Sequence, residues 1–292
     1  MLVPRVKAPF RLAIAAFCLA TPAAAQSLTA RQVLETIKTN MGVPWMEQTV
    51  DTFKDGNPDT RVTGIAVTMM ATLDVLQRAA ASGANLIITH EPTFYGHLDQ
   101  LEPLENASDA VTAAKRAFIR DHKLVVLRMH DHWHRRRPDG IETGMIRALG
   151  WERFRQPDSE FRFTMPETTL EQLAASVRDR LGSATLRVVG DPKLKVSQVA
   201  MAPGFAGFQI HTQALRRDDI QVLVIGEAHE WETVEYVSDA VSAGMRKALI
   251  VIGHIPSEQA GMQEFARWLE PLVKGVPVSF APAADPFWSP RK

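Results

Sequence analysis

Residues 85–94 read NLIITHEPTF, a short apolar run followed by two side chains that can bind a metal. Residues 86–89 are apolar or β-branched, which predicts a buried strand. His90 and Glu91 come next, followed by Pro92, so the strand would deliver an imidazole and a carboxylate into a loop at its carboxyl end. Ligands bind at that edge of open α/β sheets, because the loops leaving the strand tips open a crevice there.

The same arrangement recurs at three further predicted strands. Histidines or carboxylates follow each of them: His130, His132 and His134 after residues 124–127, Glu227 and His229 after residues 222–225, and His254 after residues 249–252. Six of the nine histidines therefore come just after a predicted strand. Four strands that end in metal-ligand chemistry predict that their tips converge on a metal.

Between these strands the sequence predicts helices at close intervals. Expected helices are 28–40 after the possible cap Ser27, 73–81, 106–121, 141–149, 169–181, 208–215, 233–243 and 256–269. The other expected strands are 62–69, an edge strand at 160–165, 186–189, 196–201 and a brief one near 278. The strands already named after residue 100 would begin near residues 123, 221 and 247. Residues 50–60 look turn-rich, and residues 130–138 look like a polar loop.

Strand, helix and strand between residues 62 and 89 form a β-α-β unit, which implies a parallel pair with a right-handed crossover. A second set of this kind follows in the later half of the chain. We therefore expect an α/β fold with two similar lobes and mixed, largely parallel sheets. Lobe one would take about 26–150 plus the C-terminal segment, and lobe two about 160–245.

Residues 1–25 have the pattern of a secretory signal peptide. Arg5, Lys7 and Arg11 precede the apolar residues 12–20, and three alanines end at residue 25. We expect cleavage before Gln26 and a periplasmic or secreted protein. The single cysteine lies inside this segment, so the mature chain would bind a metal through nitrogen and oxygen donors alone.

Overall charge and hydropathy argue against two classes of protein, nucleic-acid binders and membrane-spanning proteins. The 33 basic and 33 acidic residues balance, whereas nucleic-acid binders need a surplus of lysine and arginine. No later window reaches the roughly 18 apolar residues of a membrane-spanning helix. We expect a small-molecule substrate, no nucleic acid and no membrane span.

Four segments, IITHEPTF, APGFAG, VIGE and GHIPSE, occur in order between residues 62 and 269. Together they resemble the Nif-three-like dinuclear-metal-centre family, also called GTP cyclohydrolase 1 type 2 homologues. The resemblance implies two adjacent divalent metals, Zn, Fe or Mn, in a cleft between two α/β lobes, and a ring-shaped homohexamer.

Carried over position by position, the resemblance implies these metal ligands: His90, Glu91, His134, His254 and Glu258. His130 also matches a family histidine, and His130 or His132 could replace His134 as the donor. Glu91 replaces a family histidine and His134 replaces a family aspartate, so the two exchanges leave the total charge of the site about unchanged. A bridging role favours a carboxylate, and Glu258 is the best candidate.

The activity that fits such a site is metal-assisted hydrolysis of a small substrate, phosphorylated or heterocyclic compounds included, with Glu227 or His229 as the general base. GTP itself fits poorly with export. A metal storage or delivery protein and a ring-forming scaffold are the alternatives. Arginines 135–137 could hold an anion or form a solvated loop, and the loop at Gly204 and Gly207 lacks the lysine of a phosphate-binding P-loop.

Overall fold

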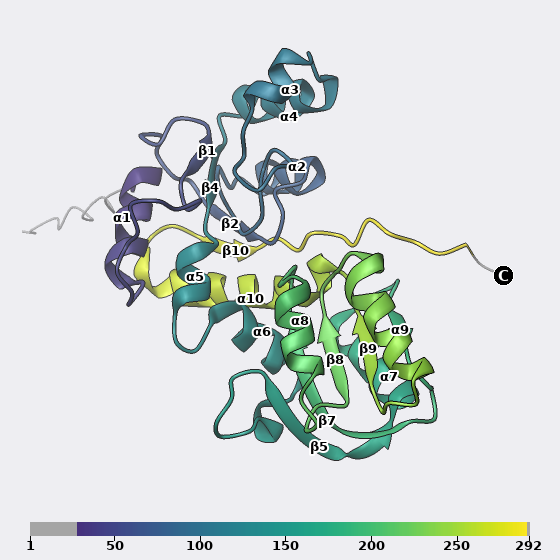
Figure 1. Cartoon of the computed structure of the whole chain (residues 1–292). Helices are drawn as coiled ribbons and strands as arrows, with labels where there is room; N and C mark the ends of the chain where they lie inside the picture. The colour runs from purple at the N-terminus through teal and green to yellow at the C-terminus, as the bar shows by residue number, and fades with distance from the viewer. Residues whose placement is uncertain (1–27, 291–292) are drawn as a thin grey trace, which may run out of the picture.

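The computed structural model describes residues 28–290, and two five-stranded sheets organise this part of the chain (Figure 1). The strands are β1 (Phe53–Asp55), β2 (Ile65–Thr68), β3 (Leu86–Thr89), β4 (Val125–Arg128), β5 (Arg162–Thr169), β6 (Arg187–Val189), β7 (Lys195–Ala202), β8 (Val222–Ile225), β9 (Ala248–Val251) and β10 (Val278–Phe280). The predicted signal peptide at 1–25 and the predicted cap Ser27 lie outside the described residues. Thr29 caps the first helix instead, because its side chain accepts from the Gln32 N–H.

Helices cover both sheets. They are α1 (Ala30–Asn40), α2 (Leu73–Ala81), α3 (Glu102–Asn106), α4 (Ala110–Asp121), α5 (Asp131–Arg135), α6 (Gly140–Leu149), α7 (Leu170–Leu181), α8 (Phe208–Leu215), α9 (Glu235–Ser242) and α10 (His254–Leu269). Short 3-10 turns occupy Glu152–Phe154 and Glu270–Leu272, and a π-helical turn, Glu230–Val234, precedes α9. None of the helices between residues 28 and 290 has both the length and the apolar character needed to cross a bilayer.

The first sheet has the strand order β1-β4-β3-β2-β10, and all neighbours are parallel except β1 with β4. Strands β2, α2 and β3 form the predicted β-α-β unit. In register, Val67 pairs with Ile88, and Ile88 pairs with Leu127. The carboxyl ends of β3 and β4 therefore lie side by side, and the residues that follow them, His90 and His130, are brought close together.

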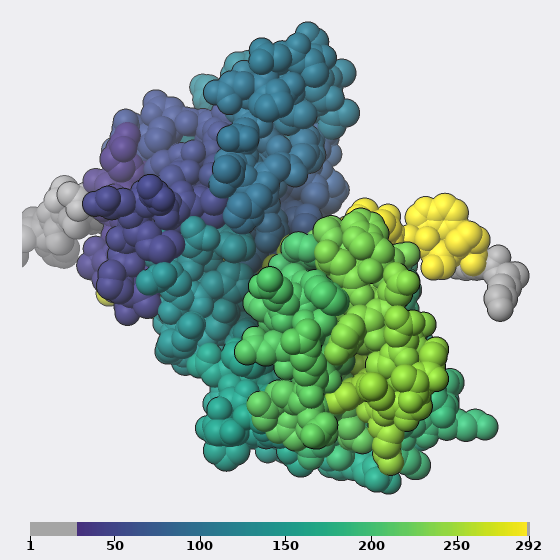
Figure 2. Space-filling model, viewed as in Figure 1, coloured from purple at the N-terminus to yellow at the C-terminus, as the bar shows by residue number. Residues whose placement is uncertain are grey.

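The second sheet has the order β5-β7-β8-β9-β6, with a parallel centre and antiparallel edges at β5 and β6. The predicted edge strand at 160–165 corresponds to β5. This sheet includes β9, which lies beyond the boundary near 245 that we expected for the second lobe. Figure 2 shows two masses, one from the early part of the chain and one from the later part, joined by the teal segment. The α/β fold with two lobes and mixed, largely parallel sheets is thus confirmed.

Helices α6 and α10 cross between the lobes at unusually short range. A Cβ on Gly144 would lie 2.4 Å from the Cα of Gly261, so both positions need glycine for the helices to touch. Ile141 of α6 packs into the core of the first lobe, whereas Met145 and Leu149 pack into the core of the second. This contact fixes the beginning of α10, with its histidine and glutamate, beside the strand tips of the first sheet.

Three sequence predictions were wrong in detail. The helix expected at 106–121 begins only at residue 110, because Asp109 caps it by accepting from the Thr112 N–H, and a separate short helix, α3, ends at Asn106. Residues 53–55, expected within a turn-rich stretch, add an antiparallel edge strand to β4. The polar loop expected at 130–138 contains helix α5.

Candidate metal centre

Helix α5 carries two histidines of the site, and a distant aspartate starts it. Asp51 is buried, and its carboxylate accepts hydrogen bonds from three consecutive backbone N–H groups, those of residues 130–132, at 2.6, 3.0 and 2.9 Å. The first turn of a helix leaves such donors without partners inside the helix. The expected loop folds as a helix because this capping group arrives from another part of the chain.

One helical turn separates His130 from His134, so both side chains lie on the same face of α5. Nδ1 of His130 lies 2.9 Å from Asp131, and Nδ1 of His134 lies 2.8 Å from Asp139. A carboxylate that accepts from one ring nitrogen fixes the tautomer and leaves the lone pair on the other nitrogen. Both rings are therefore prepared to bind a cation through Nε2.

His132, between them, faces the opposite way and has a structural role. Its ring is fully buried and stacks on Trp45 with 3.7 Å between ring centroids. Nδ1 donates to Asp51 at 2.6 Å, and Nε2 accepts from the backbone N–H of Met46 at 3.0 Å. Both nitrogens are engaged, so His132 offers no lone pair to a metal.

His90 is the central ring of the cluster. Its Nδ1 lies 3.1 Å from the carbonyl oxygen of Met129, which can only accept, so Nδ1 carries the proton. Burial lowers the pKa of His90 well below its usual value, so the ring is neutral at pH 7. Its Nε2 is then a lone-pair acceptor that is fully buried and has no hydrogen-bond partner within residues 28–290. A buried acceptor of this kind costs free energy unless its lone pair has a partner, and a bound cation would be such a partner.

The beginning of α10 adds an imidazole and a carboxylate. Glu258 is 3% exposed, and its Oε2 lies 3.5 Å from Nε2 of His90 and 3.1 Å from Nε2 of His254. The other ring nitrogen of His254, Nδ1, lies 3.0 Å from Glu227, which follows β8. Gly204 packs against this pair, and its backbone N–H donates to Ser257 at 3.0 Å. The beginning of the glycine loop is thus tied to α10.

Arg128, at the end of β4, orients Glu91. Its guanidinium is fully buried and lies 3.3 Å from Oε2 of Glu91, while its Nε donates to the carbonyl oxygen of His90 at 2.9 Å. The other carboxylate oxygen, Oε1, faces His254 at 3.4 Å and His130 at 3.8 Å. One oxygen of Glu91 is therefore anchored, and the other is directed into the cluster.

The electrostatics of the cluster favour a cation. Burial disfavours the charged form of His254, but hydrogen bonds with Glu227, Glu258 and Glu91 outweigh it and raise its pKa to about 12. Burial likewise opposes ionisation of Glu91, yet the His254 hydrogen bond and the nearby imidazoles hold the pKa of this carboxyl well below its usual range. Three carboxylates therefore hold a proton on His254 at neutral pH. A metal that binds there displaces this proton, so metal uptake should release it.

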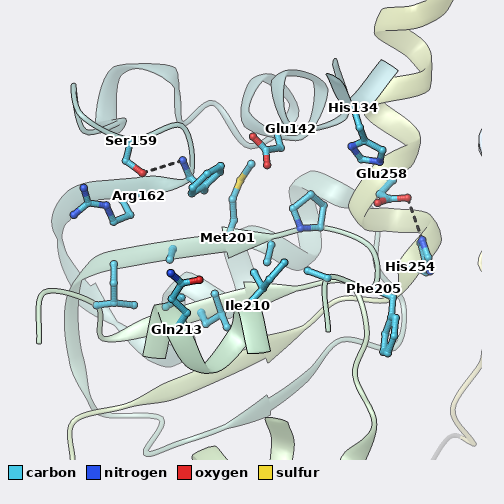
Figure 3. Close-up of a pocket in the computed structure, with 18 of the residues that line it drawn as sticks. His134, Glu142, Ser159, Arg162, Met201, Phe205, Ile210, Gln213, His254 and Glu258 are labelled. Carbon is cyan, nitrogen blue, oxygen red and sulfur yellow. Dashed lines mark hydrogen bonds and ion pairs between the residues drawn. The ribbon is translucent and has the colours of Figure 1, made fainter. Parts of the chain in front are cut away.

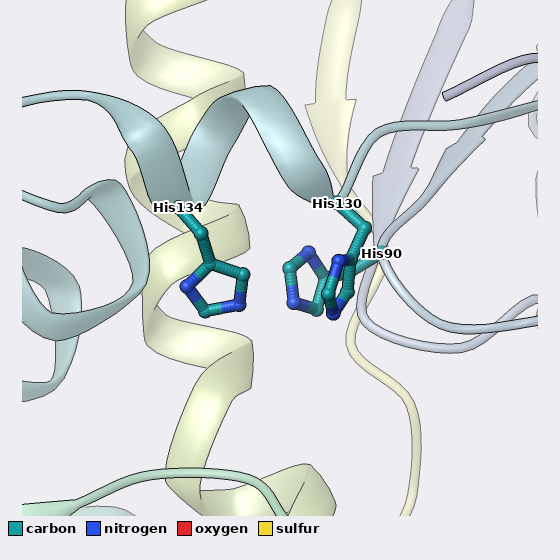
Figure 4. A group of neighbouring side chains, drawn as sticks. All are labelled: His90, His130 and His134. Carbon is teal, nitrogen blue, oxygen red and sulfur yellow. The ribbon is translucent and has the colours of Figure 1, made fainter. Parts of the chain in front are cut away.

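The side chains form two overlapping donor groups. His90, His130 and His134 each offer one ring nitrogen, and these lie within 4.8 Å of one another (Figure 4). His90, Glu91 and Glu258 form a second group by the same measure. Imidazole nitrogen with carboxylate oxygen suits Zn, Fe and Mn, and each imidazole has its other nitrogen held by a carboxylate or a carbonyl. The residues present therefore fit a divalent metal.

The cluster opens into a cavity of about 690 Å³ (Figure 3). Glu142 of α6 lines it close to His134. Burial, with the nearby charges of Asp139 and Glu160, raises the pKa of Glu142 to about 7, although His134 and Arg137 oppose this. Near neutral pH a carboxyl of this kind can donate or accept a proton.

The other predicted site residues do not line the cavity. Glu227 contacts His254, as described above, and so acts through that ring. His229 does not line the cavity: it is half-exposed, stacks on Trp231 with 4.6 Å between centroids, and lies 3.3 Å from Glu232. The arginines at 135–137 do not line the cavity either, and Arg136 lies over the rings of two tryptophans, Trp133 and Trp268.

Several supporting residues escaped the sequence prediction: Asp51, Asp139, Arg128 and Glu142. Asp139 carried a local signal, since an aspartate before a predicted helix is a good cap, and it accepts from the Ile141 N–H at 2.7 Å. Asp51 carried none, because its partners are about eighty positions away.

Comparisons with known proteins agree with one another. The family described as Duf34/NIF3 (NGG1p interacting factor 3) matches residues 49–286. A relative from Clostridium perfringens, called GTP cyclohydrolase 1 type 2 homolog, is 22% identical over 213 residues, covering 70% of this chain and 76% of the relative.

Two solved structures show the same fold. A hypothetical protein of Staphylococcus aureus has a TM-score of 0.69 at 18% identity, covering 90% of this chain and 100% of its own. A Bacillus cereus protein related to NIF3 also has a TM-score of 0.69, at 15% identity, covering 90% of this chain and 99% of its own.

Proposed function

This chain belongs to the Duf34/NIF3 family, and from that premise we propose that it binds two divalent cations and hydrolyses a small molecule in the cavity beside them. The observation that supports this most directly is the Nε2 atom of His90, a buried acceptor that belongs to both donor groups and has no hydrogen-bond partner in the part of the chain that the structure describes. The relative from Clostridium perfringens is named after a cyclohydrolase, and a cyclohydrolase is a hydrolytic enzyme.

Each side chain has a distinct role in this proposal. His130 and His134 would hold one cation, and Glu91 and His254 the other, while Glu258 and the single free ring nitrogen of His90, Nε2, would complete the donor set. Bound cations of this kind polarise the substrate and lower the pKa of a water molecule. Glu227 and Arg128 would act as positioning residues, because one holds the His254 ring and the other holds Glu91.

Glu142 is the best-placed group to transfer a proton to the leaving group. It lines the cavity beside His134 and belongs to neither of the two donor groups found among the described residues, so the proposed cations leave it free. Its near-neutral pKa matches the requirement that a general acid be protonated and still give up its proton. Glu227, our sequence-based candidate, would instead be occupied by His254.

Removal of the metal tests the proposal. We expect purified mature protein to contain divalent metal, and a chelator to abolish hydrolysis of a panel of 4-nitrophenyl phosphate, phosphodiester, ester and anilide substrates. Thermal stability should fall as well, by about 3 kcal/mol if the free metal was near 100 times its Kd. Zn, Mn and Fe(II) would be added back separately, with activity and melting temperature as the measurements.

Two outcomes would refute the proposal. Protein without bound metal, unchanged by chelator or by added cations, would exclude the metal centre. Metal that binds and exchanges within seconds, with no turnover on any substrate of the panel, would favour storage or delivery instead.

The protonation of Glu142 gives a prediction about pH. Its pKa is raised from 4.5 to about 7 in the folded state, so the folded protein binds this proton more tightly than the unfolded chain does. The stability that the bound proton provides is complete below about pH 4.5 and is lost as pH rises through 7. In metal-free protein, the free energy of unfolding of Glu142→Gln relative to that of wild type should therefore rise by about 1 to 2 kcal/mol from pH 5 to pH 8, solvent screening included. Urea unfolding at both pH values measures this, with exposed Glu167→Gln as the control. A difference that does not change with pH would contradict it.

We also propose that the chain is exported and that residues 1–25 are removed. The charged start, the apolar stretch and the three alanines support this. Mass spectrometry of the protein isolated from its native cell should then find an N-terminus near Gln26.

A further inference from the structure

The cavity beside the metal centre has two chemically different ends. The metal end is lined by the donors described above, among them His134, His254 and Glu258, which lie at one side of Figure 3. Away from them the wall is mostly apolar and comes from β7, α8 and β8 of the second lobe. Its small and aliphatic members are Ala200, Met201, Ala202, Ile210, Ala214 and Leu223. A single substrate that fills the cavity therefore meets both surfaces.

The apolar end is open because of how α8 covers the sheet. Helix α8 is short, and alanines stand at positions 200, 202 and 214 where larger side chains would close the space. Ile210 remains 53% exposed and Phe205 48% exposed, and both line the cavity. Apolar surface that stays accessible beside a cluster of ionisable groups gains free energy when an apolar ligand covers it.

The two cationic side chains at the far end are already neutralised. Arg162 lies between Asp158 at 2.6 Å and Asp219 at 2.9 Å, and Arg217 also contacts Asp219 at 2.7 Å. An anion at that end would have to displace these carboxylates. A negatively charged group of the ligand would therefore bind at the metal end.

The ligands of the metal end favour an anion. Two carboxylates, Glu91 and Glu258, belong to the donor groups, while the other members of those groups are imidazoles. Two divalent cations would keep a net positive charge after these carboxylates are counted, and an oxyanion complements it. An oxyanion head and an apolar body together match the whole cavity.

We propose that the substrate is amphipathic, with an oxyanion head that binds at the metal centre and an apolar body that lies in the groove between β7 and α8. This inference rests on the proposed metal-dependent function and adds the substrate class. The position beside the same donors, in one continuous cavity of about 690 Å³, favours a small molecule over a protein segment.

Alkylphosphonates test this, because they bind metals but are not hydrolysed. Methyl-, butyl- and hexylphosphonate would be titrated into Zn-loaded protein by calorimetry. A buried methylene is worth about 0.8 kcal/mol, or roughly fourfold in affinity, so hexylphosphonate should bind at least about tenfold more tightly than methylphosphonate even with partial burial. Ile210→Glu should remove this chain-length dependence, and it should weaken methylphosphonate binding far less than hexylphosphonate binding, because only the longer chain reaches the groove.

A neighbouring position supplies the control. Gln209→Glu adds the same charge to the same helix outside the cavity lining, so it should behave as wild type. Affinity that is independent of chain length, with metal content intact, would overturn the amphipathic substrate and leave the metal centre standing. A change of oligomeric state in Ile210→Glu, without chain-length dependence in wild type, would assign the groove to a protein contact and also overturn it. Absence of metal in the wild type would refute the proposed function itself.

Discussion

His90→Ala is expected to weaken metal binding more than about 100-fold, which exceeds the usual effect of removing a residue that only orients a ligand. The His90 ring belongs to both donor groups, and its Nε2 is the ring nitrogen left free to bind, so its loss removes a buried ligand from the centre of the site. Hydrolytic activity should disappear with the metal. Metal analysis of the purified variant, and titration of metal into chelator-treated protein, measure the effect.

The control for this variant is another buried histidine. His211 is also fully buried, its Nδ1 lies 2.8 Å from Thr233, and its Nε2 likewise has no hydrogen-bond partner among the described residues. His211→Ala should lower stability to a similar degree, because it leaves a comparable cavity, but it should keep the metal. If both variants lose metal equally, the loss reflects damage to the fold and His90 is no ligand.

The fold was largely predictable because its strands are short, buried and apolar. Residues 86–89 and 222–225 are buried throughout, so their hydrophobic runs mark them clearly, and the helices between them have a single apolar face. The order in which the strands pair was not readable in this way. Strand β6 pairs with β9, distant in sequence, and β1 is three residues long. Such pairings depend on contacts that no local pattern encodes.

The site was predictable to the extent that its groups follow strand ends. Ligand-bearing loops follow strand ends, so His90, the histidines after β4 and His254 could be expected to meet. The structure brings His90, His130, His134 and His254 together, whereas His132 faces away. What the sequence did not reveal is their orientation. Asp51 determines that α5 forms at all, and Asp139 and Arg128 direct His134 and Glu91. These contacts join segments far apart in sequence or cross between helices, so they require the folded chain.

Gly204 provides the second large effect, because no larger residue fits beside Glu258. A Cβ at this position would lie 2.1 Å from Oε1 of Glu258 and 3.2 Å from Nε2 of His254, and the backbone φ is +63°. Gly204→Ala should therefore displace the carboxylate, reduce metal affinity by about tenfold to 100-fold and lower stability. Isothermal titration with Zn and urea unfolding of the metal-free variant measure the two effects separately.

The variant Gly207→Ala is the control that separates the cost of a left-handed backbone at alanine from the displacement of Glu258. It lies in the same loop with a φ of +87°, and a Cβ there would meet no atom within 4 Å. Both alanine variants should lose about 1 to 2 kcal/mol because a left-handed backbone disfavours alanine. Only Gly204→Ala should also lose metal affinity, since only that methyl group reaches the carboxylate. Equal metal affinity in the two variants would mean that Glu258 can move without loss, and it would then be no ligand. A selective loss at Gly204 would make the position of this carboxylate, and not merely its charge, a requirement of the metal centre.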